Sequence, residues 1–394
     1  MRRWKKKNVG SMACIFWGFV ILFMLAVGFL TYQQCVVPVM GVRKYYADTG
    51  VHMQIAEKQL LAHRPSYSLL FIILKCFFSL THMSWQGTSL LFAVLMALCA
   101  GSTVWLISLW YTRYYKISPS GKVYFFSVCA CLVSMIFTTY QKATSPNVWH
   151  NPTQFISRPL CFGVIFCVYS YWEKSQSGKA DRKYLWANAV LSTLSMLAKP
   201  SFLSAFLPAV CLCLLSECVK TKGKSFFSSL QLGISFVPSL FVLWFQSRLL
   251  FGNGQGNAVA FGFHGKAGTM IWGIFASSAF CLFGWLVLWA KKKDKRILGF
   301  VGVWYATGLW VRFFFREIGQ RAADGNFVWG YMLMLFFVFI YLAGELFISP
   351  ENEKSVKKPI RMLGFALYGL HLGFGVWYFI QILRGASFLT GLML

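Results

Sequence analysis

Apolar runs long enough to cross a lipid bilayer recur along almost the whole chain, and they restrict the fold more than any other feature. The hydrocarbon core of a bilayer is about 30 Å thick, so a crossing helix needs about 20 mostly apolar residues. The sequence is 57% hydrophobic and 12% charged, against about 25% charged residues in soluble domains. No polar stretch is long enough for a separate soluble domain. We therefore predict one all-α, polytopic transmembrane domain over residues 1–394.

Clusters of Lys and Arg between the apolar runs indicate which connectors face the cytoplasm, because cytoplasmic loops are enriched in these residues. The basic start, residues 1–7, precedes the first apolar run and predicts an uncleaved anchor with a cytoplasmic N-terminus. Placing the five basic connectors inside predicts about 11 spans. The connectors are 113–122, 173–183, 220–224, 291–296 and 354–361. The predicted spans are 12–31, 88–110, 123–140, 159–172, 185–198, 201–217, 226–250, 269–290, 297–315, 327–348 and 362–383.

One apolar segment does not fit this alternation. Residues 67–80 are short for a span and include Lys75. A full crossing here would also move the basic connector 113–122 to the outside. We therefore predict that residues 67–80 form an interfacial or re-entrant helix.

The predicted topology gathers polar chemistry on the outer, exoplasmic face. Its loops are 32–87, 141–158, 251–268 and 314–326, and they include five of the six His residues. The net charge of +27 is explained by cytoplasmic loops, so we expect no nucleic-acid partner. The exoplasmic loops are the predicted active face.

The first candidate group is Asp48 with His52, followed by Glu57. Four positions separate Asp48 from His52, so on a helix both side chains lie on one face. A carboxylate at a dry interface can act as a general base toward an acceptor hydroxyl, and a neighbouring His can orient it. The alternative is an ordinary solvated loop with a surface acid.

The second candidate group lies in loop 141–158. His150 and Asn151 suit the binding of hydroxyl groups, and Arg158 suits a phosphate. Two prolines, Pro146 and Pro152, give the loop fixed turns. Trp149 can equally be a residue of the aromatic belt at the membrane surface.

Lys199 is the third candidate. It stands beside Pro200 at the outer end of two spans that are joined almost without a loop. A cation on this side opposes the usual charge bias, so it is interpreted as a ligand for a lipid phosphate. Snorkelling to lipid headgroups is the alternative.

The fourth candidate group follows the span at 297–315. Glu317, Arg321 and Asp324 recur at helical spacing, and Arg316 adds a further positive charge. Arginine binds phosphate through two parallel hydrogen bonds, so an anionic ligand is expected here. A self-paired cluster is the alternative. The Gly-rich loop 251–268 is a candidate lid.

The layout resembles that of the GT-C superfamily of polytopic membrane glycosyltransferases, in particular its bacterial members. The residues that carry the resemblance are Tyr46-Ala47-Asp48, Ile55-Ala56-Glu57 and the stretch 64–70, all in the first predicted exoplasmic loop. The resemblance implies a catalytic Asp at position 48, a polyprenyl-phosphate-sugar donor and inverting transfer. Many members carry an acid in the second exoplasmic loop, but residues 141–158 contain none. The metal requirement is therefore left open.

The leading hypothesis is a glycosyltransferase of the bacterial cytoplasmic membrane, acting on its outer face. It would move a sugar from a lipid-linked donor to a glycan or lipid acceptor of the cell envelope. Asp48 would be the general base, and the phosphate ligands would be Arg158, Lys199, Arg316 and Arg321. The substrate-binding candidates are His52, Glu57, His150, Asn151, Glu317 and Asp324. The alternatives are a transporter or flippase, or a polymerase, of lipid-linked glycans.

Overall fold

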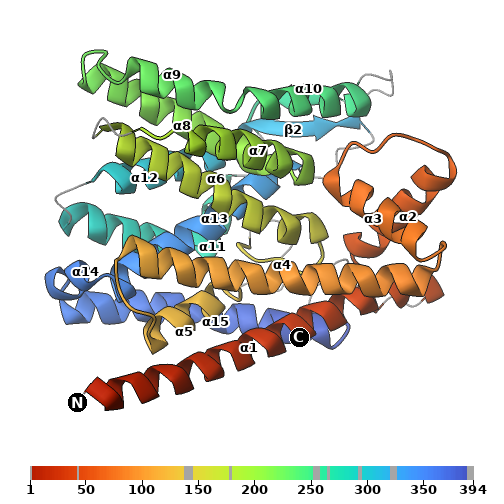
Figure 1. The fold of residues 1–394 in the computed structure, drawn as a ribbon, viewed down its shortest axis with the longest axis horizontal. Coiled ribbons are helices and arrows are strands. Elements are labelled where there is room, and N and C mark those ends of the chain that lie inside the picture. The colour runs from red at the N-terminus through yellow and green to blue at the C-terminus, as the bar shows by residue number, and fades with distance from the viewer. Residues whose placement is uncertain are drawn as a thin grey trace.

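The fold is a bundle of long helices with a small β-ribbon at its edge (Figure 1). The computed structural model describes residues 2–41, 44–136, 145–176, 180–251, 258–263, 267–291, 295–319 and 326–387. Its elements are α1 (Arg2–Val36), η1 (Pro38–Met40), α2 (Asp48–Leu61), α3 (Leu69–Leu80), α4 (Trp85–Tyr114), α5 (Gly121–Ala130), α6 (Pro152–Gln176), α7 (Lys183–Ala198), α8 (Ser201–Lys220), α9 (Phe226–Ile234), α10 (Val237–Phe251), β1 (Ala258–Phe261), α11 (Ala267–Lys291), α12 (Arg296–Phe314), β2 (Phe315–Ile318), α13 (Asn326–Ala343), the π-helix η3 (Gly344–Ile348), α14 (Pro350–Ser355) and α15 (Lys358–Leu383).

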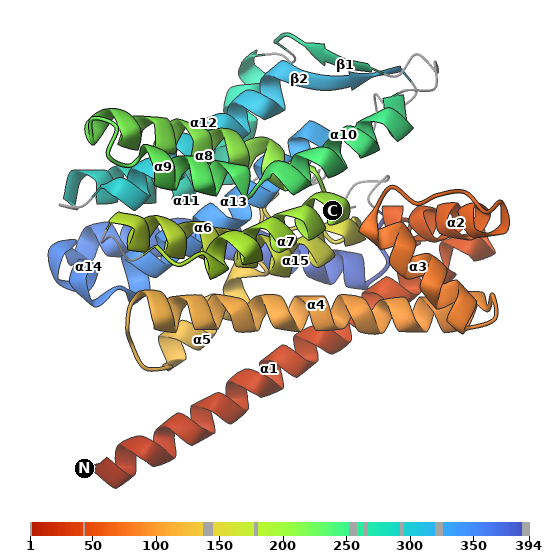
Figure 2. The ribbon, with the colours of Figure 1, turned by 45° about the horizontal axis from the view of Figure 1, so that its top comes forward.

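The predominantly helical, multi-pass architecture agrees with the prediction from the sequence. Among the described residues, nine helices are long and apolar enough to cross a membrane. They run along the long axis of the molecule, and the N-terminal half of α1 diverges from the bundle (Figure 2). The chain is therefore a membrane-embedded, multi-pass protein. Which end faces the cytoplasm stays a prediction from the loop charges.

Two of the predicted spans are not helices of crossing length. The first, 123–140, contains α5, which ends at Ala130 and is followed by non-helical backbone at 131–136; residues 137–144 lie outside the described part. The second, 185–198, corresponds to α7, which has only 16 residues. At about 1.5 Å per residue α7 is shorter than a bilayer core of about 30 Å. Hydropathy marked both segments as apolar, but it does not report helix length.

The segment predicted as interfacial or re-entrant is a short helix. α3 has 12 residues, and Ser68 accepts a hydrogen bond from the backbone of Leu70 at its start. α2 and α3 pack against each other and project together at one end of the bundle (Figure 1). The length of α3 agrees with the expectation that it does not cross the bilayer alone.

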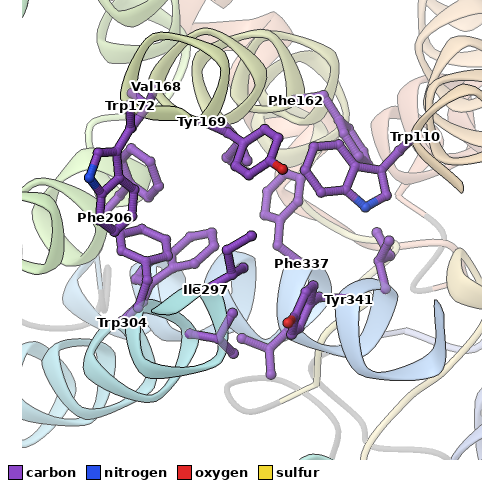
Figure 3. A pocket seen from close by; sticks show the side chains of 15 residues that line it. Trp110, Phe162, Val168, Tyr169, Trp172, Phe206, Ile297, Trp304, Phe337 and Tyr341 are labelled. Carbon is purple, nitrogen blue, oxygen red and sulfur yellow. The ribbon is translucent and has the colours of Figure 1, made fainter. Parts of the chain in front are cut away.

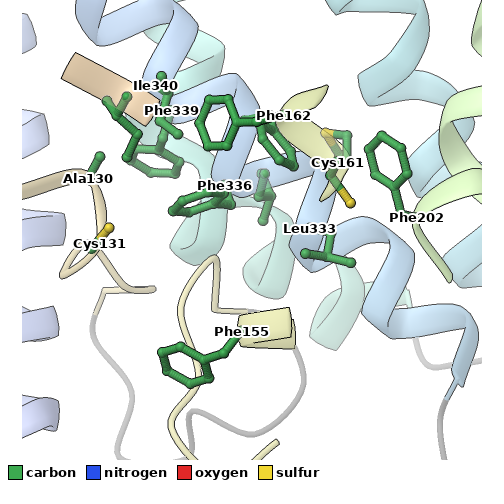
Figure 4. Packing of buried hydrophobic residues seen from close by; sticks show 14 of the residues in the cluster. Ala130, Cys131, Phe155, Cys161, Phe162, Phe202, Leu333, Phe336, Phe339 and Ile340 are labelled. Atoms are coloured by element: carbon green, nitrogen blue, oxygen red, sulfur yellow. The ribbon is translucent and has the colours of Figure 1, made fainter. Parts of the chain in front are cut away.

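α13 is the central helix of the bundle. It is apolar on all sides, as expected for a helix surrounded by protein, and it is buried from Trp329 to Ala343. α8, α11 and α12 pack around it. Its aromatic residues interlock with neighbours from other helices, such as Phe336 and Phe337 against Phe162 of α6 (Figure 4).

After α5 the chain continues as a buried, non-helical segment, residues 131–136, held between α11 and α15. Ser134 and His371 exchange backbone and side-chain hydrogen bonds, and Ile136 donates to the carbonyl of Ala276. α11 is kinked at Ser278, and the freed backbone N–H of Phe280 donates to Nε2 of His371. Non-helical backbone at membrane depth requires such internal partners because lipid offers none.

β1 and β2 form a two-stranded antiparallel ribbon, an exception to the all-α prediction. Ala258 pairs with Ile318 and Phe261 with Phe315, so the predicted loops 251–268 and 314–326 meet as strands. In Figure 2 the ribbon lies at the end of α12. The lid proposed for 251–268 is described only at 251, 258–263 and 267–268.

Candidate functional site

Asp48 is the first helical residue of α2 and contacts the loop that precedes α6. Ala47 before it is extended, so the chain turns into the helix at this point. Nδ2 of Asn151 lies 3.3 Å from Oδ2 of Asp48 and donates to it. A carboxylate in the first turn is favoured by the helix dipole. The structure therefore joins two candidate groups that are 103 residues apart in sequence.

The loop 145–151 is buried and fixed by side-chain hydrogen bonds. Nδ2 of Asn147 donates to the carbonyls of Ala130 and Val133. Oδ1 of Asn151 accepts from the backbone N–H of Thr153, which caps the start of α6. The loop was predicted as an exoplasmic connector. In the structure its described part is interior backbone that presents Asn151 to Asp48.

Gln34 of α1 connects this loop to α2. Its Nε2 donates to the carbonyl of Trp149 at 2.8 Å, and its Oε1 accepts from the hydroxyl of Thr49 at 2.8 Å. Gln34 and Thr49 are both buried. Neither was a candidate in the sequence, because Gln34 directly follows an apolar run. The amide of Gln34 was the one sequence signal, because a buried amide side chain needs hydrogen-bond partners elsewhere in the fold.

His52 lies one turn after Asp48 and faces positive charge. Its Nδ1 is enclosed and has no hydrogen-bond partner among the described residues. Burial of the ring, with the positive charge of Lys199 as a second cause, lowers the pKa of His52 to about 3. The neutral imidazole is therefore the form present at neutral pH.

Lys199 lies at the corner between α7 and α8 and is buried, with 6% of its surface exposed. Its Nζ stands 4.6 Å from the centre of the Trp329 ring, within the range of a cation–π interaction. The His150 ring lies 5.6 Å from the same indole. Trp329, near the start of α13, thus connects two candidate residues and was missed because it lies inside an apolar run.

Five candidates thus gather at one end of the bundle. We call them the Asp48 cluster: Asp48, His52, His150, Asn151 and Lys199. The cluster combines a carboxylate, a buried cation, a neutral imidazole and an amide. Such a set can accept a proton from a hydroxyl, hold a hydroxyl, and neutralise a phosphate.

Arg158 is a buried residue and not a surface cation. It is 2% exposed, and its Nη2 donates to the carbonyl of Pro146. The guanidinium stacks over the rings of Phe336 and Phe155, at 4.3 and 5.4 Å. These contacts hold Arg158 in the interior against loop 145–151, and the phosphate contact predicted from the sequence stays a prediction.

The candidates on β2 point in two directions. Glu317 is buried, and both its oxygens accept from Nδ2 of Asn326 at 2.9 Å. Asn326 starts α13 one turn before Trp329, so Glu317 lies near the Asp48 cluster. Arg316 is exposed on the opposite face of the strand, because successive strand side chains alternate.

The remaining candidates do not join the Asp48 cluster in the described structure. Glu57 is nine residues after Asp48 on α2, which is about 14 Å further along the helix axis. Arg321 and Asp324 lie outside the described residues. In the part of the chain that the structure describes, no three His, Cys, Asp or Glu side chains gather as a metal site, and the metal requirement stays open.

Comparison with known proteins gives no family assignment. The chain matches no protein-family model and no curated protein. The resemblance to GT-C enzymes therefore remains an expectation from the residues of the first predicted exoplasmic loop.

Replacing Gln34 by Leu is expected to lower the free energy of unfolding by about 1–3 kcal/mol, because the buried Thr49 hydroxyl and Trp149 carbonyl lose their partner. Thermal unfolding of the detergent-solubilised protein measures this loss. Gln33→Leu is the matched control, since the neighbouring Gln33 is only half-buried. Equal midpoints for the two variants would contradict the bridging role of Gln34.

The stability of the protein should contain a pH-dependent contribution from His52. The folded-state pKa of His52 is about 3, below its ordinary value of 6.5. The unfolded chain therefore binds a proton that the folded protein does not, and stability falls as the pH decreases from 6.5 toward 3. Above pH 6.5 the contribution is constant.

The measurement compares the thermal midpoints of the wild type and His52→Gln at pH 7.5 and pH 5. The midpoint of the wild type relative to that of the variant is expected to decrease at pH 5. A constant difference between the two proteins would show that His52 is not held neutral by its surroundings.

Proposed function

We propose that the protein is a membrane glycosyltransferase that takes a sugar from a polyprenyl-phosphate donor. The Asp48 cluster carries this proposal, in particular the contact between Asp48 and Asn151 beside the buried Lys199. Lys199 would bind the donor phosphate, and Asp48 would take the proton of the acceptor hydroxyl. His52, His150 and Asn151 would hold the sugar or the acceptor.

The chemistry of the proposed step follows from these roles. The acceptor oxygen forms a bond to the anomeric carbon while the bond from that carbon to the phosphate oxygen breaks. Asp48 receives the proton of the acceptor, and polyprenyl phosphate leaves with its charge balanced by Lys199. A general base contributes about 10²–10⁴-fold to such a step.

The site location also supports the choice of donor. On the outer face, where the loop charges place the Asp48 cluster, membrane-impermeant nucleotide sugars are absent. A lipid-linked donor can reach a site at the bundle end directly from the membrane. The acceptor would be a glycan or lipid of the bacterial cell envelope.

A transporter or flippase of lipid-linked glycans is favoured by one observation, the kink of α11 at Ser278. Transporters place substrates at discontinuous helices near the bilayer midplane. Two backbone groups near this kink, however, have partners within the protein: the carbonyl of Ala276 accepts from Ile136, and the N–H of Phe280 donates to His371. Because these backbone groups already have partners, the kink is better explained as a structural feature than as a substrate site. We therefore prefer the transferase.

The test reconstitutes the purified protein with radiolabelled polyprenyl-phosphate sugars and an envelope extract as acceptor. The expected result is transfer of label to the acceptor with release of polyprenyl phosphate, and no transfer from nucleotide sugars. Movement of the intact donor between leaflets without transfer would overturn the proposal in favour of the flippase.

A further inference from the structure

Tyr45, three residues before Asp48, has a backbone conformation that residues with a side chain rarely adopt. Its φ is +57°, in the left-handed region. For a bulky residue this region is a genuine outlier and is energetically costly. Such a residue persists only where surrounding contacts hold it, and such residues gather at functional sites. The contacts of Tyr45 must therefore offset this cost.

Tyr45 is bonded to the C-terminal end of α15 by two hydrogen bonds. Its hydroxyl donates to the carbonyl of Leu383 at 2.9 Å, and its backbone N–H donates to the carbonyl of Gly385 at 3.1 Å. The last carbonyls of a helix have no partner within the helix. Here the carbonyls of residues 380–382 accept from residues 384–386, and the carbonyl of Leu383 accepts from Tyr45. Tyr45 thus completes the hydrogen bonding at the end of α15.

The chain after Asp48 is fixed as well, on α1. The hydroxyl of Thr49 donates to Gln34, and a Cβ added at Gly50 would stand 3.0 Å from the carbonyl oxygen of Gln34. The first turn of α2 therefore approaches α1 closely. Ala47, Thr49 and Gly50 are buried, whereas Asp48 among them is partly exposed. An accessible carboxylate thus stands on a segment that is held on both sides.

These anchors differ in kind from the packing elsewhere in the bundle. In Figure 3 aromatic rings from several helices, among them Trp110, Trp304 and Phe337, surround an apolar space. The burial of apolar groups is non-directional, whereas a hydrogen bond weakens steeply when its angle is poor. Two hydrogen bonds from one residue therefore define the orientation of the segment that carries Asp48 more sharply than apolar contacts do.

We propose that Tyr45 is a positioning residue for the transfer step. By joining the start of α2 to the end of α15, it keeps the carboxylate of Asp48 beside Asn151, where Nδ2 lies 3.3 Å from Oδ2. A misplacement of about 1 Å can cost about 100-fold in rate. This inference rests on the proposed function, because Tyr45 acts through the general base and contacts neither donor nor acceptor.

The test compares Tyr45→Gly with His63→Gly. Glycine adopts a left-handed φ without steric cost, but at position 45 it removes the hydroxyl that bonds Leu383. His63 follows α2, has a φ of +51° and is exposed, so its replacement relieves the same conformation without removing an anchor. Tyr45→Gly is expected to lower kcat at least about tenfold and to change the KM for the donor less than about twofold. His63→Gly is expected to change neither.

A milder variant and a second background separate positioning from loss of folded protein. Tyr45→Phe removes only the hydroxyl and is expected to lower kcat about threefold. In an Asp48→Asn background the base is already absent, so Tyr45→Gly should lower the residual rate less than about twofold. The same loss in both backgrounds, or an unchanged kcat in both Tyr45 variants, would overturn the proposal.

Hydrogen exchange tests the anchor independently of activity. Amides of residues 48–53 are expected to exchange at least about fivefold faster in Tyr45→Gly than in the wild type, and at the wild-type rate in His63→Gly. Unchanged exchange in Tyr45→Gly overturns the anchor, whatever the activity. Faster exchange in a protein whose wild type transfers no sugar would instead contradict the proposed function, and the anchor would stand.

Discussion

Asp48→Asn is expected to lower the rate of sugar transfer at least about 100-fold while the fold stays intact. The amide keeps the shape of the side chain and can still accept from Nδ2 of Asn151, but it cannot take a proton. The size of the loss corresponds to removing a general base, about 10²–10⁴-fold. Initial rates with a polyprenyl-phosphate sugar measure the loss of activity. The thermal midpoint measures whether the fold stays intact.

Asp181→Asn is the matched control for Asp48. Asp181 forms an exposed ion pair with Lys183 at 2.8 Å, at the start of α7. Surface pairs of this kind contribute little to stability, so neither activity nor stability should change much. A well-folded Asp48→Asn protein that transfers sugar as fast as the wild type would remove Asp48 from the mechanism.

Gly375→Ala is expected to have the largest effect on stability, a loss of about 3 kcal/mol or more. A Cβ at position 375 would stand 1.6 Å from the carbonyl oxygen of Leu132, so backbone has to move. Overpacking of a filled core typically costs about 1–3 kcal/mol, and here a backbone group is the obstacle. The change should also disturb Ser134, which is bonded to His371.

The control for this variant lies in the same helix. A methyl group added at Gly373 would meet no other atom within 4 Å, so Gly373→Ala should be neutral or stabilise α15 by up to about 1 kcal/mol. Thermal unfolding in detergent compares the two variants. Equal midpoints would mean that residues 131–136 do not pack against α15.

The sequence predicts the long helices well because each needs one continuous apolar run, and α13 is such a run. It fails at residues 131–136 because burial in protein selects the same apolar residues as burial in lipid. Ser134 and Asn147 are the local clues, since buried polar side chains often bond exposed backbone groups. Their partners in other elements were not predictable from the sequence.

The candidate site was likewise predictable from the sequence only in part. The spacing of Asp48 and His52 predicts a common helical face, and the corner at Lys199 predicts a cation at a bundle end. The approach of Asn151 to Asp48 depends on tertiary packing through Gln34, so no local sequence pattern predicts this contact. Arg158 was predicted to be a loop cation, but aromatic stacking holds it in the interior.

The most direct measurement of the central claim is an experimental structure of the protein with a non-hydrolysable polyprenyl-phosphate-sugar analogue. We predict density for the phosphate at Lys199, with the sugar between Asp48 and Asn151. A well-defined analogue bound elsewhere, with the Asp48 cluster untouched, would contradict the account.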